Sequence, residues 1–173
     1  MPATDLECLS QAIYFEARSE SEAGQTAVAE VVLNRAKSGR YPGQICEVVY
    51  QRNHRTCQFT FTCDGSIGRG VVNAAAWARA TRIAHSVLSG AASRQLPDSA
   101  LNYHANYVSP SWGRRLQRVR QIGAHIFYGP SVDGSPTPGA LDAPVTQTAQ
   151  TGGLIIARNE ALDAAYAALG GGR

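Results

Sequence analysis

The sequence has 173 residues, the length of one domain with a short appendage. A hydrophobic content of 44% and a charged content of 17% exclude a wholly disordered or fibrous chain. The sequence has no internal repeat that would indicate a repeat protein, and no apolar run long enough to indicate a membrane span. The net charge of +3 rests on arginine, since Lys37 is the only lysine and the other 15 basic side chains are Arg. Arginine favours planar contacts with carboxylates or phosphates over diffuse attraction.

Two helices are predicted at the start of the chain. The first, over 5–18, has one stripe at three- and four-residue steps, formed by Leu6, Leu9, Ile13 and Glu16. Ser19 followed by Glu22 matches a capping box, so a second helix should begin there and end near 38–39. The inward face of this second helix consists of Val28, Val31, Val32 and Arg35.

The pattern changes after the second helix. Phe59 and Phe61 alternate with polar residues, which predicts a short strand or hairpin within 50–70. A third helix is predicted over 71–89, with apolar residues at helical spacing at Val72, Ala76, Ile83 and Val87. Residues 100–112 predict an irregular loop rich in Tyr, His, Asn and Trp. An arginine-rich stretch follows, and the segment IGAHIFYG after it predicts a strand or a closing segment.

The composition divides the chain into a domain over 1–128, a linker over 129–153 rich in Pro, Gly, Ser and Thr, and a terminal amphipathic helix within 154–173. A short amphipathic helix on a tether usually docks on something. We therefore expect residues 154–169 to contact the domain, a virion protein or another partner. The start of the chain lacks the basic flank and apolar stretch of a signal peptide.

Four cysteines, at 8, 46, 57 and 63, allow three pairings. Cys57 and Cys63 are near enough in sequence to close a short loop, which leaves Cys8 with Cys46. Two disulfides would imply an oxidising compartment outside the cytoplasm, and four reduced core cysteines are the alternative. The spacing does not match a zinc site, since neither pair is Cys-x-x-Cys and the His residues are scattered.

Glu16 is unexpected on an apolar stripe, because a carboxylate on the core side of a helix costs free energy unless it is paired, hydrogen-bonded or protonated. One explanation is a structural ion pair with Arg35 of the second helix. The other is that burial beside Tyr14 and Phe15 raises the pKa of Glu16, so that it can deliver a proton at working pH. Cleavage of a glycosidic bond requires such an acid.

Most glycosidases also use a second carboxylate. The candidates are Glu20, one turn beyond Glu16, and Asp64 in the turn CDG. Each also has an ordinary structural explanation, Glu20 at the start of a helix and Asp64 before a turn glycine. If no second carboxylate is used, a hydroxyl group of the sugar itself must attack.

Separated motifs occur in order along the chain: LSQAIYFEARSESEAGQTAVAEVVLNRAKSGRYPGQICEVVYQ, then CQFTFTCDG, YHANYVSPSW and IGAHIFY. Together they resemble the SleB/CwlJ cell wall hydrolase family over residues 6–128. The resemblance implies an α+β, mainly α, lysozyme-like domain with a small β-hairpin or sheet, related to lytic transglycosylases. It also implies cleavage of peptidoglycan between N-acetylmuramic acid and N-acetylglucosamine, with Glu16 as acid and base.

A substrate groove would follow from this resemblance, with aromatic rings stacking on sugars and polar groups orienting their substituents. Its expected walls are Gln58, Phe59 and Phe61 on one side and Tyr103, His104, Asn106 and Trp112 on the other. Unlike the spore enzymes, this chain adds the segment from 129 onward and shows no wall-binding domain. A phage endolysin, a virion-associated hydrolase or a periplasmic enzyme is therefore expected in place of a germination enzyme.

Three other interpretations compete with this one. A zinc amidase would need clustered His and acid ligands, and no His-Glu-x-x-His occurs. A glycan-binding or virion structural module of the same fold would have lost activity, against which the presence of Glu16 argues. Nucleic-acid binding through RRLQRVR, residues 114–120, is disfavoured because no binding motif accompanies it. No cofactor is expected, and a structural calcium ion is left open.

Overall fold

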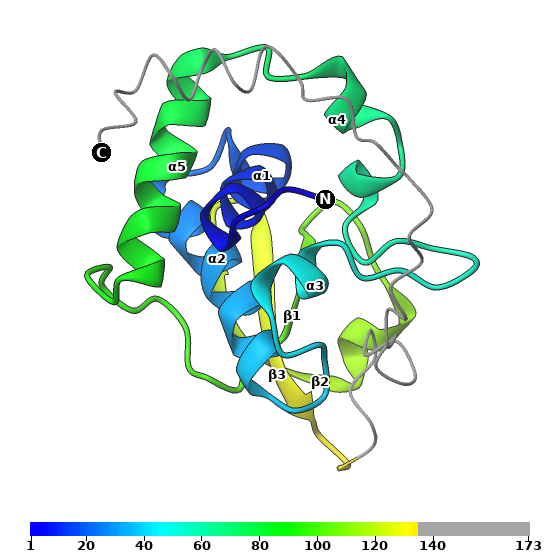
Figure 1. Ribbon diagram of the computed structural model, residues 1–173. Coiled ribbons are helices and arrows are strands. Elements are labelled where there is room, and N and C mark those ends of the chain that lie inside the picture. Colours follow the sequence, from blue (N-terminus) through cyan, green and yellow to red (C-terminus); the bar gives the residue numbers. More distant parts are fainter. Residues whose placement is uncertain (135–173) are drawn as a thin grey trace.

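The computed structural model describes residues 1–134, which form a mainly helical α+β domain as expected (Figure 1). Its elements, in chain order, are α1 (Asp5–Ala17), α2 (Glu22–Lys37), α3 (Ile45–Val49), η1 (Thr60–Thr62), α4 (Ser66–Arg69), α5 (Ala74–Leu88), β1 (Asn102–Ala105), η2 (Ser111–Arg114), β2 (Leu116–Ile122) and β3 (His125–Ser131). The predicted linker boundary lies inside β3, which continues to Ser131. The predicted terminal helix over 154–173 lies outside the described residues.

The first two helices confirm the sequence prediction, with one change at a cap. The Thr4 hydroxyl caps α1 by accepting a hydrogen bond from the Glu7 amide. The second helix begins at Glu22, where the Ser21 hydroxyl accepts a hydrogen bond from the Gly24 amide, so the predicted cap at Ser19 is wrong by two residues. Ser19 instead lies in the turn between the helices, and α1 ends at Ala17, just after Glu16.

The helical core is formed by α1, α2 and α5 packing on one another. From the predicted stripes, Leu9, Ile13 and Val32 are fully buried in this core. Val28 and Val31 are also fully buried, on the side of α2 that faces the sheet. The Tyr14 hydroxyl accepts hydrogen bonds from the amides of Val72 and Asn73 and so ties α1 to the start of α5. Val72 itself is 79% exposed and lies outside the helix, contrary to its predicted place on the apolar stripe.

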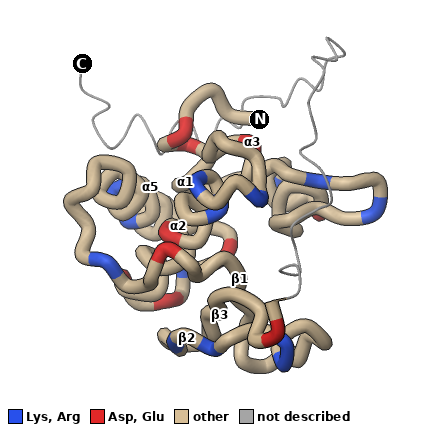
Figure 2. Tube along the Cα trace, turned by 90° about the horizontal axis from the view of Figure 1, so that it is seen from below, with Lys and Arg blue, Asp and Glu red and all other residues tan. Residues whose placement is uncertain are grey.

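The sheet has three antiparallel strands in the order β1-β3-β2. It lies to one side of the helices (Figure 2). Phe127 of β3 is fully buried against Ala27, Val28 and Val31 of α2, so this ring joins the sheet to the helices. The sequence predicted β3 but placed β1 in an irregular loop, and β2 was considered only as an arginine patch. Both strands are short or largely polar, which hides the alternation that normally marks a strand.

The segment between α3 and α5 forms turns instead of the predicted hairpin. The strand pairing within this segment is limited to one isolated β-bridge, between Arg52 and Cys57. Phe61 lies in the 3-10 turn η1. Phe59 and Phe61 are both 3% exposed, as two residues on one face of a strand would be. Here, however, Phe59 is an extended residue just before the turn and Phe61 lies within it. The helix α3 was not predicted, since five residues carry too little periodicity.

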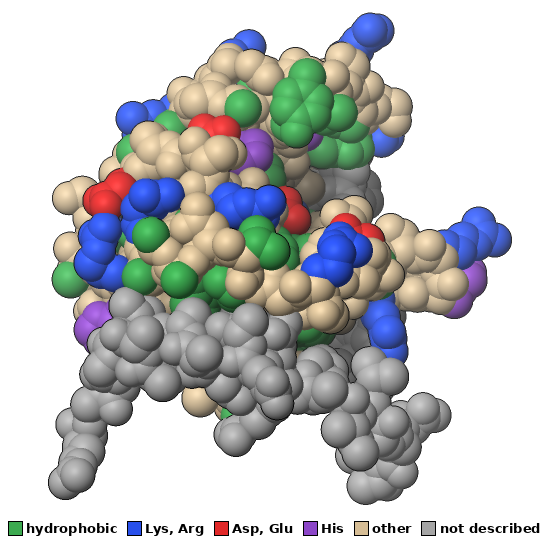
Figure 3. All heavy atoms as spheres, turned by 90° about the horizontal axis from the view of Figure 1, so that it is seen from above, with side chains coloured by type: hydrophobic (Ala, Val, Ile, Leu, Met, Phe, Trp, Pro, Cys, Tyr) green, Lys and Arg blue, Asp and Glu red, His purple; other side chains and the backbone are tan. Residues whose placement is uncertain are grey.

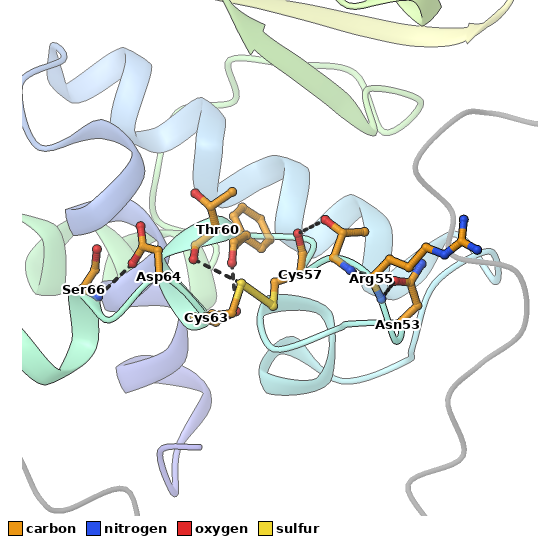
Figure 4. The surroundings of a disulfide bond; sticks show 10 residues. Asn53, Arg55, Cys57, Thr60, Cys63, Asp64 and Ser66 are labelled. Atoms are coloured by element: carbon orange, nitrogen blue, oxygen red, sulfur yellow. Dashed lines mark hydrogen bonds between the residues drawn. A yellow bond between two sulfur atoms is a disulfide. The ribbon is translucent and has the colours of Figure 1, made fainter.

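Both disulfides pair as the spacing favoured. Cys8 of α1 is bonded to Cys46 of α3, and Cys57 is bonded to Cys63 across η1 (Figure 4). The first bridge fastens a short helix to the core, and the second closes the loop that leads to Asp64. Within the described part of the chain, no helix is both long and apolar enough to span a membrane.

Candidate active site

Glu16 lies in the last turn of α1, at the border between the helical core and the sheet. Its side chain is partly buried, and its Oε2 atom accepts a hydrogen bond of 3.0 Å from the Tyr103 hydroxyl of β1. The preceding ring, Phe15, stacks on Phe61 with centroids 4.9 Å apart. The apolar stripe therefore ends in a carboxyl group that is shielded from solvent on one side.

The surroundings of Glu16 make it a weaker acid than an exposed glutamate. Burial is the largest influence and raises the pKa of Glu16 above its ordinary value of 4.5. The hydrogen bond from Tyr103 and the charge of Arg35 lower the pKa, and the charge of Asp64 raises it again. The net effect is upward, which is the direction that a proton donor needs.

Tyr103 is held as a permanent hydrogen-bond donor to Glu16. Its ring packs against His125 and Phe127 of β3, with centroids 5.0 Å and 5.6 Å away. Burial and the Glu16 carboxylate raise the pKa of Tyr103 well above 10, so its hydroxyl keeps its proton. Burial also lowers the pKa of His125, which leaves an uncharged ring on this side of the sheet.

Arg35 brings a buried positive charge to the site from α2. Its Nε atom donates a hydrogen bond of 2.7 Å to the Leu101 carbonyl, next to the start of β1. The guanidinium lies over the rings of Tyr41 and Phe59, at 4.9 Å and 5.5 Å from their centroids. The predicted pairing of Glu16 with Arg35 is thus present as an electrostatic influence, and Arg35 also fastens the strand that carries Tyr103.

Asp64 is a carboxylate whose charge raises the pKa of Glu16. It follows the Cys57–Cys63 bridge and accepts a hydrogen bond of 2.8 Å from the Ser66 amide (Figure 4). The Arg69 guanidinium lies 3.8 Å from the Asp64 carboxylate. Hydrogen bonds from Ser66 are the main reason that the pKa of Asp64 lies below its ordinary value. Asp64 is exposed and has a lowered pKa, whereas Glu16 is partly buried and has a raised pKa, so the environments of the two carboxyl groups differ.

Glu20, the other predicted candidate for a second carboxylate, makes a structural contact with the turn between β2 and β3. Its Oε2 atom accepts a hydrogen bond of 3.2 Å from the Ala124 amide in the turn between β2 and β3. Gly123 has a φ of +55° there, and a Cβ atom at this position would lie 1.9 Å from Oε2 of Glu20. The carboxylate of Glu20 therefore holds the turn.

The structure separates the predicted wall residues into four groups. Phe59 and Phe61 are core side chains, which leaves their rings no free face for a sugar. Gln58 and Asn106 are at least partly exposed, and their backbone amides bond to Gln51 and Ala124. Of the wall residues, Tyr103 makes a direct contact with Glu16.

His104 and Trp112 lie on the other face of the sheet from Glu16. Consecutive residues of a strand point to opposite faces, so His104 points away from the helices that Tyr103 contacts. The His104 ring stacks on Tyr128 at 5.3 Å, and Trp112 meets both rings edge-on at 5.5 Å. Tyr128 was missed as a partner, although its alternation with Phe127 in IGAHIFY would have placed it on this outer face.

Two competing kinds of site gain no support from the geometry. Among residues 1–134, no three His, Cys, Asp or Glu side chains are grouped in a way that could hold a metal ion. Basic side chains are spread over several elements and interspersed with acidic ones on the face shown in Figure 3, as they are along the chain in Figure 2. Within the arginine patch, Arg118 and Arg120 donate to Gln121 and Gln95.

A family model described as cell wall hydrolase matches residues 19–128. Spore cortex-lytic enzymes of Bacillus subtilis and Halalkalibacterium halodurans are 32% and 30% identical over 127 and 125 residues, which is 71% of this chain in each case. The chain spans 37% and 34% of the length of these two relatives.

Two solved structures share the fold and confirm the expected lysozyme-like class. The catalytic domain of the germination-specific lytic transglycosylase SleB from Bacillus anthracis has a TM-score of 0.59 and 26% identity, covering 74% of this chain and 96% of that domain. The catalytic domain of the Bacillus cereus SleB protein has a TM-score of 0.54 and 24% identity, covering 74% and 94%. The family match begins just after Glu16, so the role of Glu16 depends on the geometry described above.

Proposed function

Because the chain belongs to the cell wall hydrolase family, we propose that it cleaves the glycan strand of peptidoglycan between N-acetylmuramic acid and N-acetylglucosamine, with Glu16 as acid and base. The observation that carries this proposal is the partly buried Glu16 carboxyl, with its raised pKa and its hydrogen bond from Tyr103. The similarity to a lytic transglycosylase domain supports the choice of reaction.

In the first step, protonated Glu16 gives its proton to the glycosidic oxygen while the bond from that oxygen to the anomeric carbon of muramic acid breaks. Positive charge then develops at the anomeric carbon. The ionised carboxylate of Asp64 favours this step, because its charge stabilises the cation and raises the pKa of Glu16. Tyr103 orients the Glu16 carboxyl through its hydroxyl.

In the second step, the C6 hydroxyl of the same muramic acid attacks the anomeric carbon and gives its proton to the Glu16 carboxylate. A new bond between the anomeric carbon and O6 replaces the broken one, and Glu16 recovers the proton that it lost. No water is consumed, and the product has a 1,6-anhydromuramyl end. One carboxyl group therefore serves both steps, as a lytic transglycosylase requires. A hydrolytic muramidase would instead need Asp64 to activate water or act as nucleophile.

We place this activity outside the cytoplasm, where the polymer is found. The bonds Cys8–Cys46 and Cys57–Cys63 suit an oxidising compartment. A phage endolysin, a virion-associated hydrolase and a periplasmic wall-remodelling enzyme all fit this setting.

Mass spectrometry of soluble products from purified peptidoglycan tests the proposal. We expect anhydromuramyl ends from the wild-type protein, none from Glu16→Gln, and the same ends from Asp64→Asn at a reduced rate. Glu20→Gln is the matched control, since it changes a nearby carboxylate assigned to the scaffold. Reducing muramic ends that disappear with Asp64→Asn would replace transglycosylation by hydrolysis, and no products from the wild type would favour a glycan-binding module.

A further inference from the structure

A hollow of about 490 Å³ opens on the outer face of the sheet, away from Glu16. Its floor is formed by His104 and Tyr128, and its rim by Ser109, Ser111 and Arg114. This volume lies within the range of ligand sites for small molecules, which is roughly 300–1,000 Å³. The cell wall reaction described above uses none of these side chains.

The floor of the hollow is held rigidly. The Nδ1 atom of His104 lies 2.8 Å from the Ala105 carbonyl oxygen, which can only accept, so Nδ1 carries a hydrogen. The Nε2 atom lies 2.8 Å from the Tyr128 hydroxyl oxygen, so both ring nitrogens are engaged. Trp112 packs edge-on against both rings. A ligand would meet a preformed surface and would not have to order it.

Arg114 supplies the charge at the rim. Arg118 and Arg120 of the neighbouring strand donate to Gln121 and Gln95, whereas in the part of the chain that the structure describes no hydrogen bond or ion pair engages the Arg114 guanidinium. Ser109 and Ser111 add hydroxyl groups beside it. Guanidinium and hydroxyl donors next to aromatic walls favour a carboxylate attached to a compact organic group.

The hollow cannot hold the bond that Glu16 would cleave, because Tyr103 and His104 point to opposite faces of β1. Peptidoglycan also carries short peptides on the lactyl groups of its muramic acids, and these peptides bear carboxylates. They project from the glycan strand, so a strand at Glu16 or a neighbouring strand can present one to the far face of this small sheet.

We propose that the hollow lined by His104, Ser109, Ser111, Arg114 and Tyr128 is a binding site for a carboxylate of the peptidoglycan stem peptide. This inference rests on the proposed function for its choice of polymer. It adds a second point of attachment to the wall, separate from the glycan contact at Glu16, and it predicts that Arg114 is the main determinant of affinity.

Chemical-shift titration of the 173-residue chain tests the site without any turnover. The probe is the tripeptide L-alanyl-γ-D-glutamyl-diaminopimelate, and chitotetraose, which has no carboxylate, is the comparison. We expect the tripeptide to shift the amides of Ser111 and Gly113 and the indole of Trp112, while the indole of Trp77, 2% exposed in the core, stays unchanged. Chitotetraose should leave all of them unchanged.

Arg114→Gln should weaken tripeptide binding about 10- to 100-fold, the usual loss for a hydrogen-bonded charge. Arg115→Gln is the matched control: it removes the same charge from the next residue, which is exposed and outside the hollow, and should change affinity less than about twofold. Glu16→Gln should bind the tripeptide like the wild type, because Glu16 lies outside the hollow. Binding at the hollow can therefore be tested even if Glu16 proves not to be the catalytic acid.

Three results would overturn the inference: no shifts at millimolar tripeptide, equal affinity in Arg114→Gln and the wild type, or the same shifts from chitotetraose. The last result would identify a sugar site in place of a carboxylate site.

Discussion

Two regions of the helical layer each hold a buried glutamate, and they treat it differently. Glu30, in the middle of α2, is 4% exposed and accepts hydrogen bonds from the amides of Gln95 and Leu96, with Arg94 at 3.5 Å. Glu16, at the end of α1, is less buried and within residues 1–134 receives one hydrogen bond, from Tyr103.

The difference shows how a structural carboxylate is distinguished from a reactive one. Backbone amides and a guanidinium fully satisfy Glu30, which fastens the segment between α5 and β1 to α2. Glu16 has apolar neighbours in place of such partners, and its pKa is raised as a result. Burial with few hydrogen-bond donors raises the pKa of a carboxyl group, which is the property that a general acid needs.

The largest effect is expected for Glu16→Gln. Removing the general acid should lower kcat by about 10²- to 10⁴-fold, measured as release of soluble muropeptides. The same change should raise Tm by a few degrees at neutral pH, because it removes a carboxylate that ionises less readily in the folded state. Because the pKa of Glu16 is higher in the folded state, ionisation of Glu16 destabilises the fold at neutral pH. The gain in Tm should vanish as the pH falls below 4.5, where Glu16 is protonated in both the folded and the unfolded state. A lower Tm at neutral pH would contradict the account.

Glu30→Ala should show the reverse pattern. Leaving the amides of Gln95 and Leu96 without an acceptor should destabilise the fold by about 2–4 kcal/mol in urea unfolding. Activity per folded molecule should stay within about twofold of the wild type, since Glu30 has no contact with Glu16. Loss of kcat with retained stability would show that the two carboxylates had been assigned the wrong way round.

Gly123→Ala tests whether Glu20 belongs with Glu30 as a scaffold carboxylate. An alanine should cost about 1–2 kcal/mol for its left-handed backbone alone, and a further loss is expected from the contact with Oε2 of Glu20. Gly39→Ala is the control, because Gly39 has a φ of +70° and nothing within 4 Å of an added Cβ. Equal losses of unfolding free energy in the two variants would mean that Glu20 does not hold the turn.

The smallest effects are expected from the two groups that tune Glu16, and they have opposite signs. A general acid loses activity as the pH rises through its pKa. Tyr103→Phe removes an interaction that lowers the pKa of Glu16, so the alkaline limb of the kcat/KM profile should move to higher pH. Asp64→Asn removes a charge that raises this pKa, so the limb should move to lower pH. Shifts in the same direction would exclude Glu16 as the titrating acid.

The sequence revealed the region around Glu16 well, because long helices have a clear period. A carboxylate that breaks an apolar stripe is visible in such a helix, and the nearby Arg35 could be placed on the facing helix in the same way. The cysteine spacing also led to the observed disulfides.

The sheet and the loops were harder to predict. The strand β1 has four residues and lies in a segment rich in turn formers, so its alternation cannot be recognised. Without β1, the opposite directions of Tyr103 and His104 are hidden, and both were placed on one wall. The alternation of Phe59 and Phe61 with polar residues led to a wrong prediction of a strand. Phe59 is a single extended residue, and Phe61 lies in the 3-10 turn that follows it.

The most direct test of the central claim compares the titration of Glu16 with the pH dependence of activity. The Glu16 carboxyl carbon can be followed by ¹³C NMR, with Glu16→Gln to assign it, and kcat/KM measured over the same range. The account predicts a midpoint above 4.5 that coincides with the alkaline limb, and a joint upward shift of both in Tyr103→Phe. A midpoint at or below 4.5, or an alkaline limb that Tyr103→Phe leaves in place, would contradict it.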